Sequence, residues 1–321
     1  MPIIDQLCDD LRAEHDSLVA VVSAIDEKGW STPTPAAGWD VRDTISHLTF
    51  FHEQATLAID DPPAFEAHKA LLMASTPPPR AASDAGAGRD RNPGAGRDAG
   101  AAQEAGAGPD GATGRDRDPG AGRDAGAGPD VALGRDLRRT HGDDAALLER
   151  WTASRDALIA RALRAVDEAG GAPPRVAWYG PPMSMASFIS ARIMETWAHG
   201  ADVRDALGVP LEASVSGRLR HVCHLAYGAR AFTFAAHGVT DPGDPVAMVV
   251  NAPGGDTWTW GPAASETDNV ITGPALDIAL VFTQRRHPSR TAVKATGPTA
   301  KRWLSIAQAF AGPPTLTPAD R

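Results

Sequence analysis

Three side chains that commonly bind divalent metals occur at positions that a helical bundle can bring together. Glu195 and His199 are four residues apart, so on a helix they lie one turn apart on the same face. The surrounding stretch is rich in apolar residues and predicts a helix buried on most sides, where an acid and an imidazole must pair or bind something. His47 lies on another predicted helix, beside its apolar face. Two nitrogens and one oxygen leave a metal with open positions, which is typical of catalytic sites.

Each of these signals has a simpler interpretation. The Glu195–His199 spacing alone favours a hydrogen-bonded pair inside the bundle, or a face turned to solvent, over a metal site. A lone histidine such as His47 is more often a satisfied core residue than a ligand. Two helices that each send a histidine inward, one with a carboxylate a turn away, are a less common coincidence and favour the metal. Asp202, one turn past His199, either orients an imidazole or is a solvated acid near the helix end.

Four predicted helices would position these residues. Apolar residues recur at helical spacing over residues 3–27, 40–59, 142–169 and 184–208, which together predict a four-helix bundle. Asp40 is the predicted N-cap of the second helix, with Asp43 in its first turn, and Gly208 is the predicted C-cap of the fourth. From about residue 212 the pattern mixes helices with short strands and predicts a small α+β domain, with helices at 214–236, 274–285 and 298–310 and strands at 246–250, 257–260 and 291–295.

Residues 76–135 have a different composition, dominated by Gly, Ala, Pro, Arg and Asp. The run GRDRNPGAGRDAGA, which begins at Gly88, returns as GRDRDPGAGRDAGA from Gly114. Repeats of this period can indicate a solenoid, but these units have no apolar face to stack. We therefore predict a disordered insert between the second and third helices. The predicted organisation is a helical bundle over residues 1–208, interrupted by the insert, and an α+β domain over residues 212–321.

The composition excludes several classes of protein. The 321 residues carry a formal net charge of −9, with a pI of about 5.5, which argues against a nucleic-acid-binding surface. No run of 18 apolar residues predicts a membrane span, and the N-terminus lacks the pattern of a secretory signal. The two cysteines, Cys8 and Cys223, are far apart in sequence, and neither is placed as a nucleophile or in a disulfide framework. We expect a cytoplasmic protein with small-molecule partners; its oligomeric state is left open.

Two sequence stretches resemble those of a known family. GWDVRDTISHL, which contains His47, and METWAHGADVRDALG, which contains Glu195 and His199, resemble the signature stretches of DinB-like metal-binding bundles. More narrowly, they resemble the mycothiol-dependent maleylpyruvate isomerase branch found in actinobacteria. The resemblance covers residues 1–75 and 140–208. The tail, through GPALDIALVFTQRR and AQAFAGPP, is similar to the sterol-carrier-like C-terminal domain of that branch, whereas the repeat insert departs from it.

The resemblance implies a site and a chemistry. In the family, the residues at the positions of His47, Glu195 and His199 bind a divalent metal, often zinc. A metal with open positions lowers the pKa of a low-molecular-weight thiol such as mycothiol. The thiolate then adds to a small electrophile, in S-transfer or in a cis–trans isomerisation. The related isomerases also use an arginine of the C-terminal domain, and Arg285 and Arg286 are the candidates for that role. Alternatively, these two arginines only interact with the dipole at the end of their helix. The substrates of this family vary, so the resemblance does not identify the substrate of this protein.

Two other functions remain compatible with the sequence. A metal-bound water would make the protein a hydrolase, for which Asp202 is the only candidate general base. A non-enzymatic protein would instead hold an apolar ligand in the second domain, with a structural metal or none.

Several further residues have open roles. His15 and His52 are spare ligands if the helices face differently from the prediction. His221 and His224 form H-x-x-H without a third ligand, and we interpret them as structural. Trp178 and Tyr179, just before the fourth helix, either line the mouth of a cleft or pack in the core.

Overall fold

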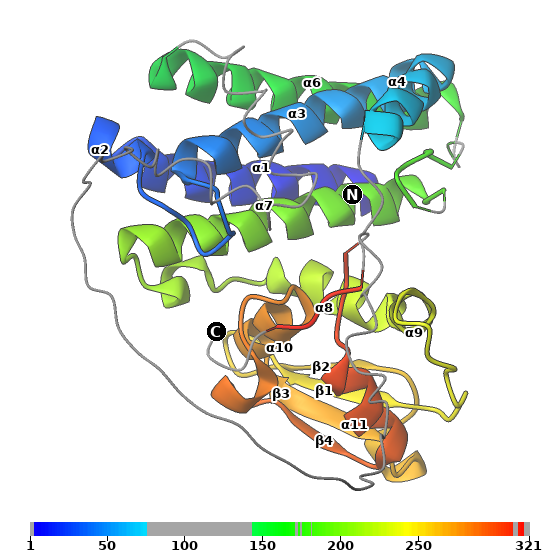
Figure 1. The fold of residues 1–321 in the computed structure, drawn as a ribbon. Helices are drawn as coiled ribbons and strands as arrows, with labels where there is room; N and C mark the ends of the chain where they lie inside the picture. The colour runs from blue at the N-terminus through cyan, green and yellow to red at the C-terminus, as the bar shows by residue number, and fades with distance from the viewer. Residues whose placement is uncertain are drawn as a thin grey trace, which may run out of the picture.

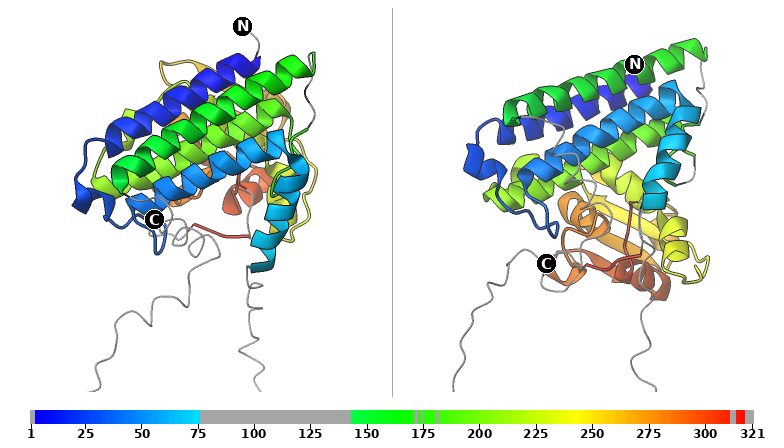
Figure 2. Two further views of the ribbon diagram at one scale, coloured as in Figure 1. Left: turned by 90° about the horizontal axis from the view of Figure 1, so that it is seen from above. Right: turned by 45° about the horizontal axis from the view of Figure 1, so that its top comes forward.

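The N-terminal part of the computed structural model is a bundle of four long helices. The structure describes residues 3–75, 143–170, 173, 175–180, 182–310 and 314–317. The bundle helices run side by side (Figure 1), and Figure 2 shows the same arrangement from two further directions. They are α1 (Ile3–Val22), α3 (Val41–Asp60), α6 (Asp144–Glu168) and α7 (Met185–Leu207). Two shorter helices, α2 (Glu27–Trp30) and α4 (Pro62–Ser75), precede and follow α3.

Capping residues set the ends of the helices that carry the predicted ligands. The Asp40 side chain accepts a hydrogen bond from the Asp43 amide (2.8 Å), and the Asp43 side chain accepts one from the Asp40 amide (3.1 Å). This reciprocal capping box fixes the start of α3 less than two turns before His47. Helix α7 ends at Gly208, whose φ of 67° lies in the left-handed region that favours glycine. The predicted caps at Asp40 and Gly208 are therefore confirmed.

The C-terminal part contains a small sheet covered by helices. The sheet has the order β2-β1-β3-β4, with β1 parallel to β3 and the other pairs antiparallel. Its strands are β1 (Ala247–Asn251), β2 (Thr257–Trp260), β3 (Val270–Pro274) and β4 (Lys294–Thr296). The helices of this part are α8 (Leu219–Gly228), α9 (Arg230–Ala236), α10 (Ala275–Phe282) and α11 (Pro298–Ser305), and the short 3₁₀ turns lie at Leu211–Ser214, Ala264–Glu266 and Pro288–Arg290.

Helix α7 belongs to two cores at once. Its residues Phe188, Ile189 and Ile193 pack inside the bundle. On another side, Trp197 and neighbouring residues join the core formed by α8, α10, α11 and the sheet. Figure 1 shows α8 and α10 between α7 and the strands. The prediction that this helix is buried on most sides is confirmed, and α7 contributes apolar residues to the cores of both parts of the fold.

The predicted fold class, a mostly helical chain with a four-helix bundle followed by a small α+β part, is confirmed. Several predicted elements differ in detail. The first helix ends at Val22 rather than at 27, the predicted helix 214–236 is divided into α8 and α9 around Ala229, and the last helix stops at Ser305. The last predicted strand, 291–295, lies at Lys294–Thr296.

The elements that were not predicted include helix α4 and strand β3. Helix α4 begins at Pro62, shortly after the predicted end of the second helix at residue 59. Proline is well tolerated in a first helical turn, and the Asp61 side chain caps α4 by accepting a hydrogen bond from the Ala64 amide (3.0 Å). Strand β3 is short and ends in Gly-Pro, so the local sequence gives little indication that it pairs in parallel with β1.

Part of the predicted organisation stays a prediction. The insert at 76–135 lies outside the described residues, and the domain limits at 1–208 and 212–321 remain predicted. In the described part of the chain, no helix combines the length and apolarity needed to cross a membrane.

A histidine is buried inside the bundle away from the predicted ligands. The ring of His15 on α1 lies 3.8 Å, centroid to centroid, from that of Trp151 on α6. Arg155 donates a hydrogen bond to Nδ1 of His15 (3.2 Å). Burial, assisted by the Arg155 charge, lowers the pKa of His15 to about 4. His15 is therefore a neutral core residue at neutral pH.

This burial predicts a pH-dependent stability. An unfolded histidine has a pKa of about 6.5, so between pH 6.5 and pH 4 the unfolded chain binds the additional proton. The stability contributed by neutral His15 is complete above that window and falls as the pH drops through it, by about 2 kcal/mol from pH 7 to pH 5. Urea unfolding at pH 7 and pH 5 gives the free energy of unfolding at each pH. Its decrease between the two pH values should be smaller in His15→Asn than in the unmodified protein by about 2 kcal/mol. An unchanged pH dependence in the variant would contradict the assignment.

Candidate metal centre

The structure brings His47, Glu195 and His199 together. One ligand atom from each lies within 4.8 Å of the other two, in the only such group of three among the described residues. Nε2 of His199 is 3.6 Å from Oε2 of Glu195. Ligands about 2.1 Å from a tetrahedral metal are about 3.4 Å apart, so this pair already has a suitable separation. The rings of His47 and His199 have centroids 4.7 Å apart.

Aromatic rings enclose the two histidines. Trp39, in the turn before α3, stacks on His199 with centroids 5.8 Å apart and planes 9° from parallel. The same indole is 4.7 Å from the His47 ring, and Phe51, one turn along α3, is 4.6 Å from it. Glu195 is the most accessible of the three, with 27% of its side chain exposed. The site is therefore walled by apolar rings and reaches solvent on the carboxylate side.

The electrostatics keep two of the three groups in the form that binds metal. Burial, together with the His199 charge, lowers the pKa of His47 well below its ordinary value. For Glu195, burial acts to raise the pKa, but the His199 hydrogen bond and the charges of Arg192, His199 and His47 outweigh it and lower the pKa to about 2. A metal needs a neutral imidazole and an ionised carboxylate. The buried Nδ1 of His47 also lacks a hydrogen-bond partner, as expected of a nitrogen placed for a ligand that the protein does not supply.

An arginine from the C-terminal part reaches this centre. Arg285, just after α10, donates hydrogen bonds from Nε and Nη2 to the Asp202 carboxylate (3.2 and 2.7 Å). Its Nη2 is also 3.5 Å from Nδ1 of His199. Asp202 Oδ2 is itself 3.7 Å from that nitrogen, too far for a direct hydrogen bond. Asp202 is thus a buried acid held by Arg285, not a solvated acid at the helix end.

The other sequence candidates lie elsewhere. Arg286 pairs with Asp205 through two hydrogen bonds (2.8 and 2.9 Å), so of the two adjacent arginines only Arg285 faces the histidines. His221 contacts Asp10 (2.8 Å), and His224 accepts a hydrogen bond from Trp260 (3.1 Å).

The spare bundle histidines also point away from the three ligands. His15 and His52 lie near each other, with ring centroids 6.4 Å apart, and neither is part of the three-ligand group.

Two residues near the centre were missed from the sequence. Trp39 lies inside the stretch that contains His47, but tryptophans in turns give no specific signal. Arg192 lies one turn before Glu195 on α7 and is only 5% exposed. A charged residue on an otherwise apolar helix, three positions from a predicted ligand, is the signal that would have identified it.

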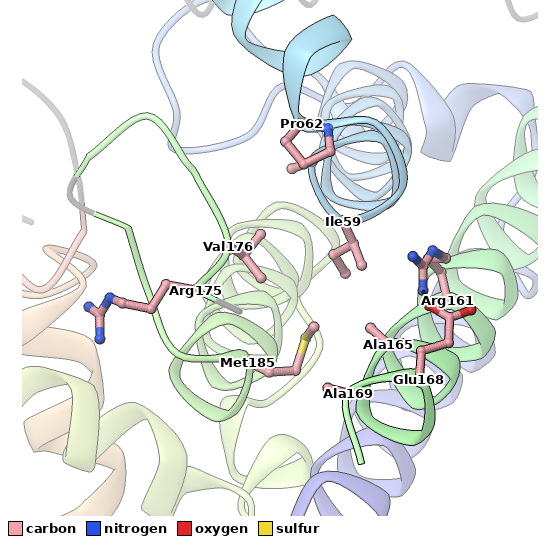
Figure 3. A pocket seen from close by; sticks show the side chains of 10 residues that line it. Ile59, Pro62, Arg161, Ala165, Glu168, Ala169, Arg175, Val176 and Met185 are labelled. Atoms are coloured by element: carbon pink, nitrogen blue, oxygen red, sulfur yellow. Dashed lines mark hydrogen bonds and ion pairs between the residues drawn. The ribbon is translucent and has the colours of Figure 1, made fainter. Parts of the chain in front are cut away.

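A separate cavity lies far from this centre. It has a volume of about 310 Å³ and opens between the ends of α3, α6 and α7 (Figure 3), beside Ile59, Arg161 and Met185. Met185 precedes Glu195 by ten residues, which corresponds to about 15 Å along α7. This cavity therefore does not adjoin the predicted ligands.

The fold and the site define a class of protein, a DinB-like helical bundle with a candidate metal centre on α3 and α7. The sequence matches the family described as the mycothiol maleylpyruvate isomerase N-terminal domain over residues 11–105 and 95–204, more than half of the chain. The chain belongs to this family.

Similar proteins are known among mycobacteria and among solved structures. Uncharacterized proteins MT0041 and Rv0036c, from two strains of Mycobacterium tuberculosis, are each 37% identical over 305 residues, which covers 95% of both chains. The crystal structure of a mycothiol-dependent maleylpyruvate isomerase is 15% identical, with a TM-score of 0.47 and coverage of 92% of this chain and 93% of that one. A histidine-to-alanine mutant of that enzyme gives 14% identity and the same TM-score.

The Arg285–Asp202 contact yields a prediction. In Arg285→Met, the Asp202 carboxylate, whose side chain is 1% exposed, loses the cation that compensates its burial. We expect destabilisation by about 3 kcal/mol in urea unfolding. Adding Asp202→Asn to Arg285→Met should recover most of the lost stability, because the buried carboxylate of this pair is then also removed. Additive effects in this double-mutant cycle would contradict a coupled pair.

Proposed function

We propose that this protein is a metal-dependent enzyme that uses a small thiol of the mycothiol type in S-transfer to, or isomerisation of, a small electrophile. The observation that carries the proposal is the convergence of His47, Glu195 and His199 from two bundle helices. Membership of the mycothiol maleylpyruvate isomerase family supports the choice of a thiol.

The three side chains suit a divalent metal, with zinc the best candidate. Two imidazoles and one carboxylate are a common ligand set for catalytic zinc and leave positions open for other ligands. A metal bound there supplies one thing, a lowered pKa for a coordinated thiol, so that thiolate is available at neutral pH. His47 and Glu195 are already in their ligating protonation states, so little rearrangement of protons is needed.

The remaining residues would orient and confine the reactants. His199 turns Nε2 toward Glu195, while its Nδ1 faces Arg285 and Asp202. Such outer partners hold a ligating ring in one orientation. The guanidinium of Arg285 adds positive charge beside the centre, where it would stabilise a thiolate or an enolate-like oxygen as negative charge develops. Trp39 and Phe51 exclude water from the histidine side.

The competing hydrolase receives less support. Its only candidate base was Asp202, and that carboxylate accepts two hydrogen bonds from Arg285 and is 1% exposed. A carboxylate engaged by a guanidinium is a weak proton acceptor. Asp202 is therefore better suited to positioning Arg285 and His199 than to activating water.

Metal content tests the ligand set. Protein purified with zinc should hold stoichiometric metal, and His47→Ala and His199→Ala should each lose most of it, because two ligands bind zinc far more weakly than three. His221→Ala, a histidine that contacts Asp10, is the matched control and should keep its metal. Metal content can be measured by atomic emission. Equal metal in all four proteins would refute the site.

Spectroscopy of the cobalt-substituted protein tests the thiol. Adding mycothiol should change the visible spectrum, because a thiolate ligand introduces intense sulfur-to-metal transitions. S-methylated mycothiol, which cannot form a thiolate, should leave the spectrum unchanged. If mycothiol also leaves it unchanged while the cobalt is bound, the thiol function is wrong and the hydrolase or the binding protein becomes the better account.

A further inference from the structure

One buried guanidinium in the bundle has no hydrogen-bonding partner among the described residues. Arg192 on α7 is 5% exposed, and its Nε is buried without an acceptor. Over the described ranges, no carboxylate or carbonyl makes an ion pair or hydrogen bond with it. Buried arginines elsewhere in the bundle differ: Arg155 binds Asp16, and Arg204 donates to Ser17 (2.9 Å). Glu195 supplies a nearby negative charge, but a buried guanidinium whose N–H groups lack acceptors is still costly, so its retention calls for a reason.

Aromatic rings hold this guanidinium in place. Its central carbon lies 4.5 Å from the centroid of the Trp178 ring and 5.9 Å from that of Phe188. These cation–π contacts offset part of the burial cost, but they use the faces of the guanidinium and leave its N–H groups, which point outward in its plane, without acceptors. The arginine is therefore oriented, but its hydrogen-bonding capacity is unused.

A second hydrogen-bond donor lies against the same tryptophan. The rings of Tyr179 and Trp178 have centroids 5.0 Å apart, and the Tyr179 hydroxyl is buried without a hydrogen-bond partner. Burial raises the pKa of Tyr179 to about 12, although the nearby Arg192 charge acts to lower it. The hydroxyl is therefore protonated at neutral pH and can donate a hydrogen bond.

The group that would satisfy both residues is an anion. A guanidinium only donates, in a fork that matches the two oxygens of a carboxylate. A carboxylate also accepts additional hydrogen bonds, such as one from a phenol. A water molecule would accept one or two of these bonds but would bring no negative charge to the guanidinium.

These donors lie beside the three ligand residues. Arg192 precedes Glu195 by three positions on α7, so the two Cβ atoms are about 5–6 Å apart on one face of the helix. Phe51 bridges the two groups, with its ring 4.6 Å from that of His47 and 5.6 Å from that of Tyr179. An anion bound by Arg192 would thus lie within a few ångströms of the candidate metal.

We infer that Arg192 and Tyr179 form an anion subsite of this centre, and that it binds the carboxylate of the electrophilic substrate. The assignment rests on the proposed function, because it places the electrophile next to the thiol. Binding the carboxylate at Arg192 leaves the adjacent carbons of the substrate over Glu195 and the histidines. The subsite therefore selects small electrophiles that carry a carboxylate and rejects their uncharged amides.

Benzoate is a suitable probe, because it is a small carboxylate and benzamide is its uncharged analogue of nearly the same shape. Calorimetry on the zinc-loaded full-length protein should detect benzoate binding, and benzamide should not compete. Arg192→Met should weaken benzoate at least tenfold, which corresponds to about 1.4 kcal/mol. Tyr179→Phe, which removes only one oxygen, should weaken it about threefold. Arg161→Met is the control, because Arg161 already pairs with Asp60 (2.8 Å). This variant should bind benzoate as tightly as the unmodified protein does.

Stability and metal content separate this role from a structural one. Arg192→Met should retain zinc, because the three ligands are unchanged, and melt no lower than the unmodified protein, because the buried guanidinium makes no hydrogen bond that the variant would lose. Unchanged benzoate affinity in Arg192→Met, a lowered melting temperature with loss of zinc, or no benzoate binding by the unmodified protein would overturn the subsite. If mycothiol leaves the cobalt spectrum unchanged while benzoate still depends on Arg192, the proposed function fails and the anion subsite stands.

Discussion

The burial of helix α7 between two hydrophobic cores is the constraint on which the rest of the structure depends. Its sides pack into the bundle and into the C-terminal core, yet it carries Arg192, Glu195, His199 and Asp202. Each charge on such a helix must find compensation. Asp202 finds it in Arg285, whereas Glu195 and His199 face each other and His47. Arg192 finds aromatic faces and the nearby Glu195 charge, but no hydrogen-bond acceptor among the described residues. The residues that make these charge pairs, together with Arg192 and its missing hydrogen-bond acceptor, form the candidate site.

The contact between the two parts of the fold follows from the same constraint. Arg285 comes from the turn after α10, and its guanidinium bridges to Asp202 and approaches His199. The C-terminal part therefore does more than cover an apolar face of α7, because it supplies the cation that fixes the acid beside a candidate ligand. Disturbing the packing of α10 against the sheet would move Arg285 and alter the site from outside the bundle. Residues from both parts of the chain therefore lie at the candidate centre.

Local patterns in the sequence were sufficient to predict the main helices and the proximity of the three candidate ligands. The helical spacing of Glu195 and His199, the cap at Asp40 and the glycine at 208 are local signals that packing did not override. Partners from distant segments could not be predicted in this way. Which of Arg285 and Arg286 faces His199 depends on how the turn after α10 packs, and the walls formed by Trp39 depend on the turn before α3. The same holds for β3, whose pairing with β1 is non-local.

The central claim is that His47, Glu195 and His199 hold one catalytic metal with room for a thiol. X-ray absorption spectroscopy of the zinc-loaded protein tests it most directly. The account predicts a shell of nitrogen and oxygen at about 2.0–2.2 Å with the scattering pattern of two imidazoles, and one sulfur at about 2.3 Å after mycothiol is added. A shell without imidazole would contradict the ligand assignment, and the absence of sulfur with the thiol present would contradict the chemistry.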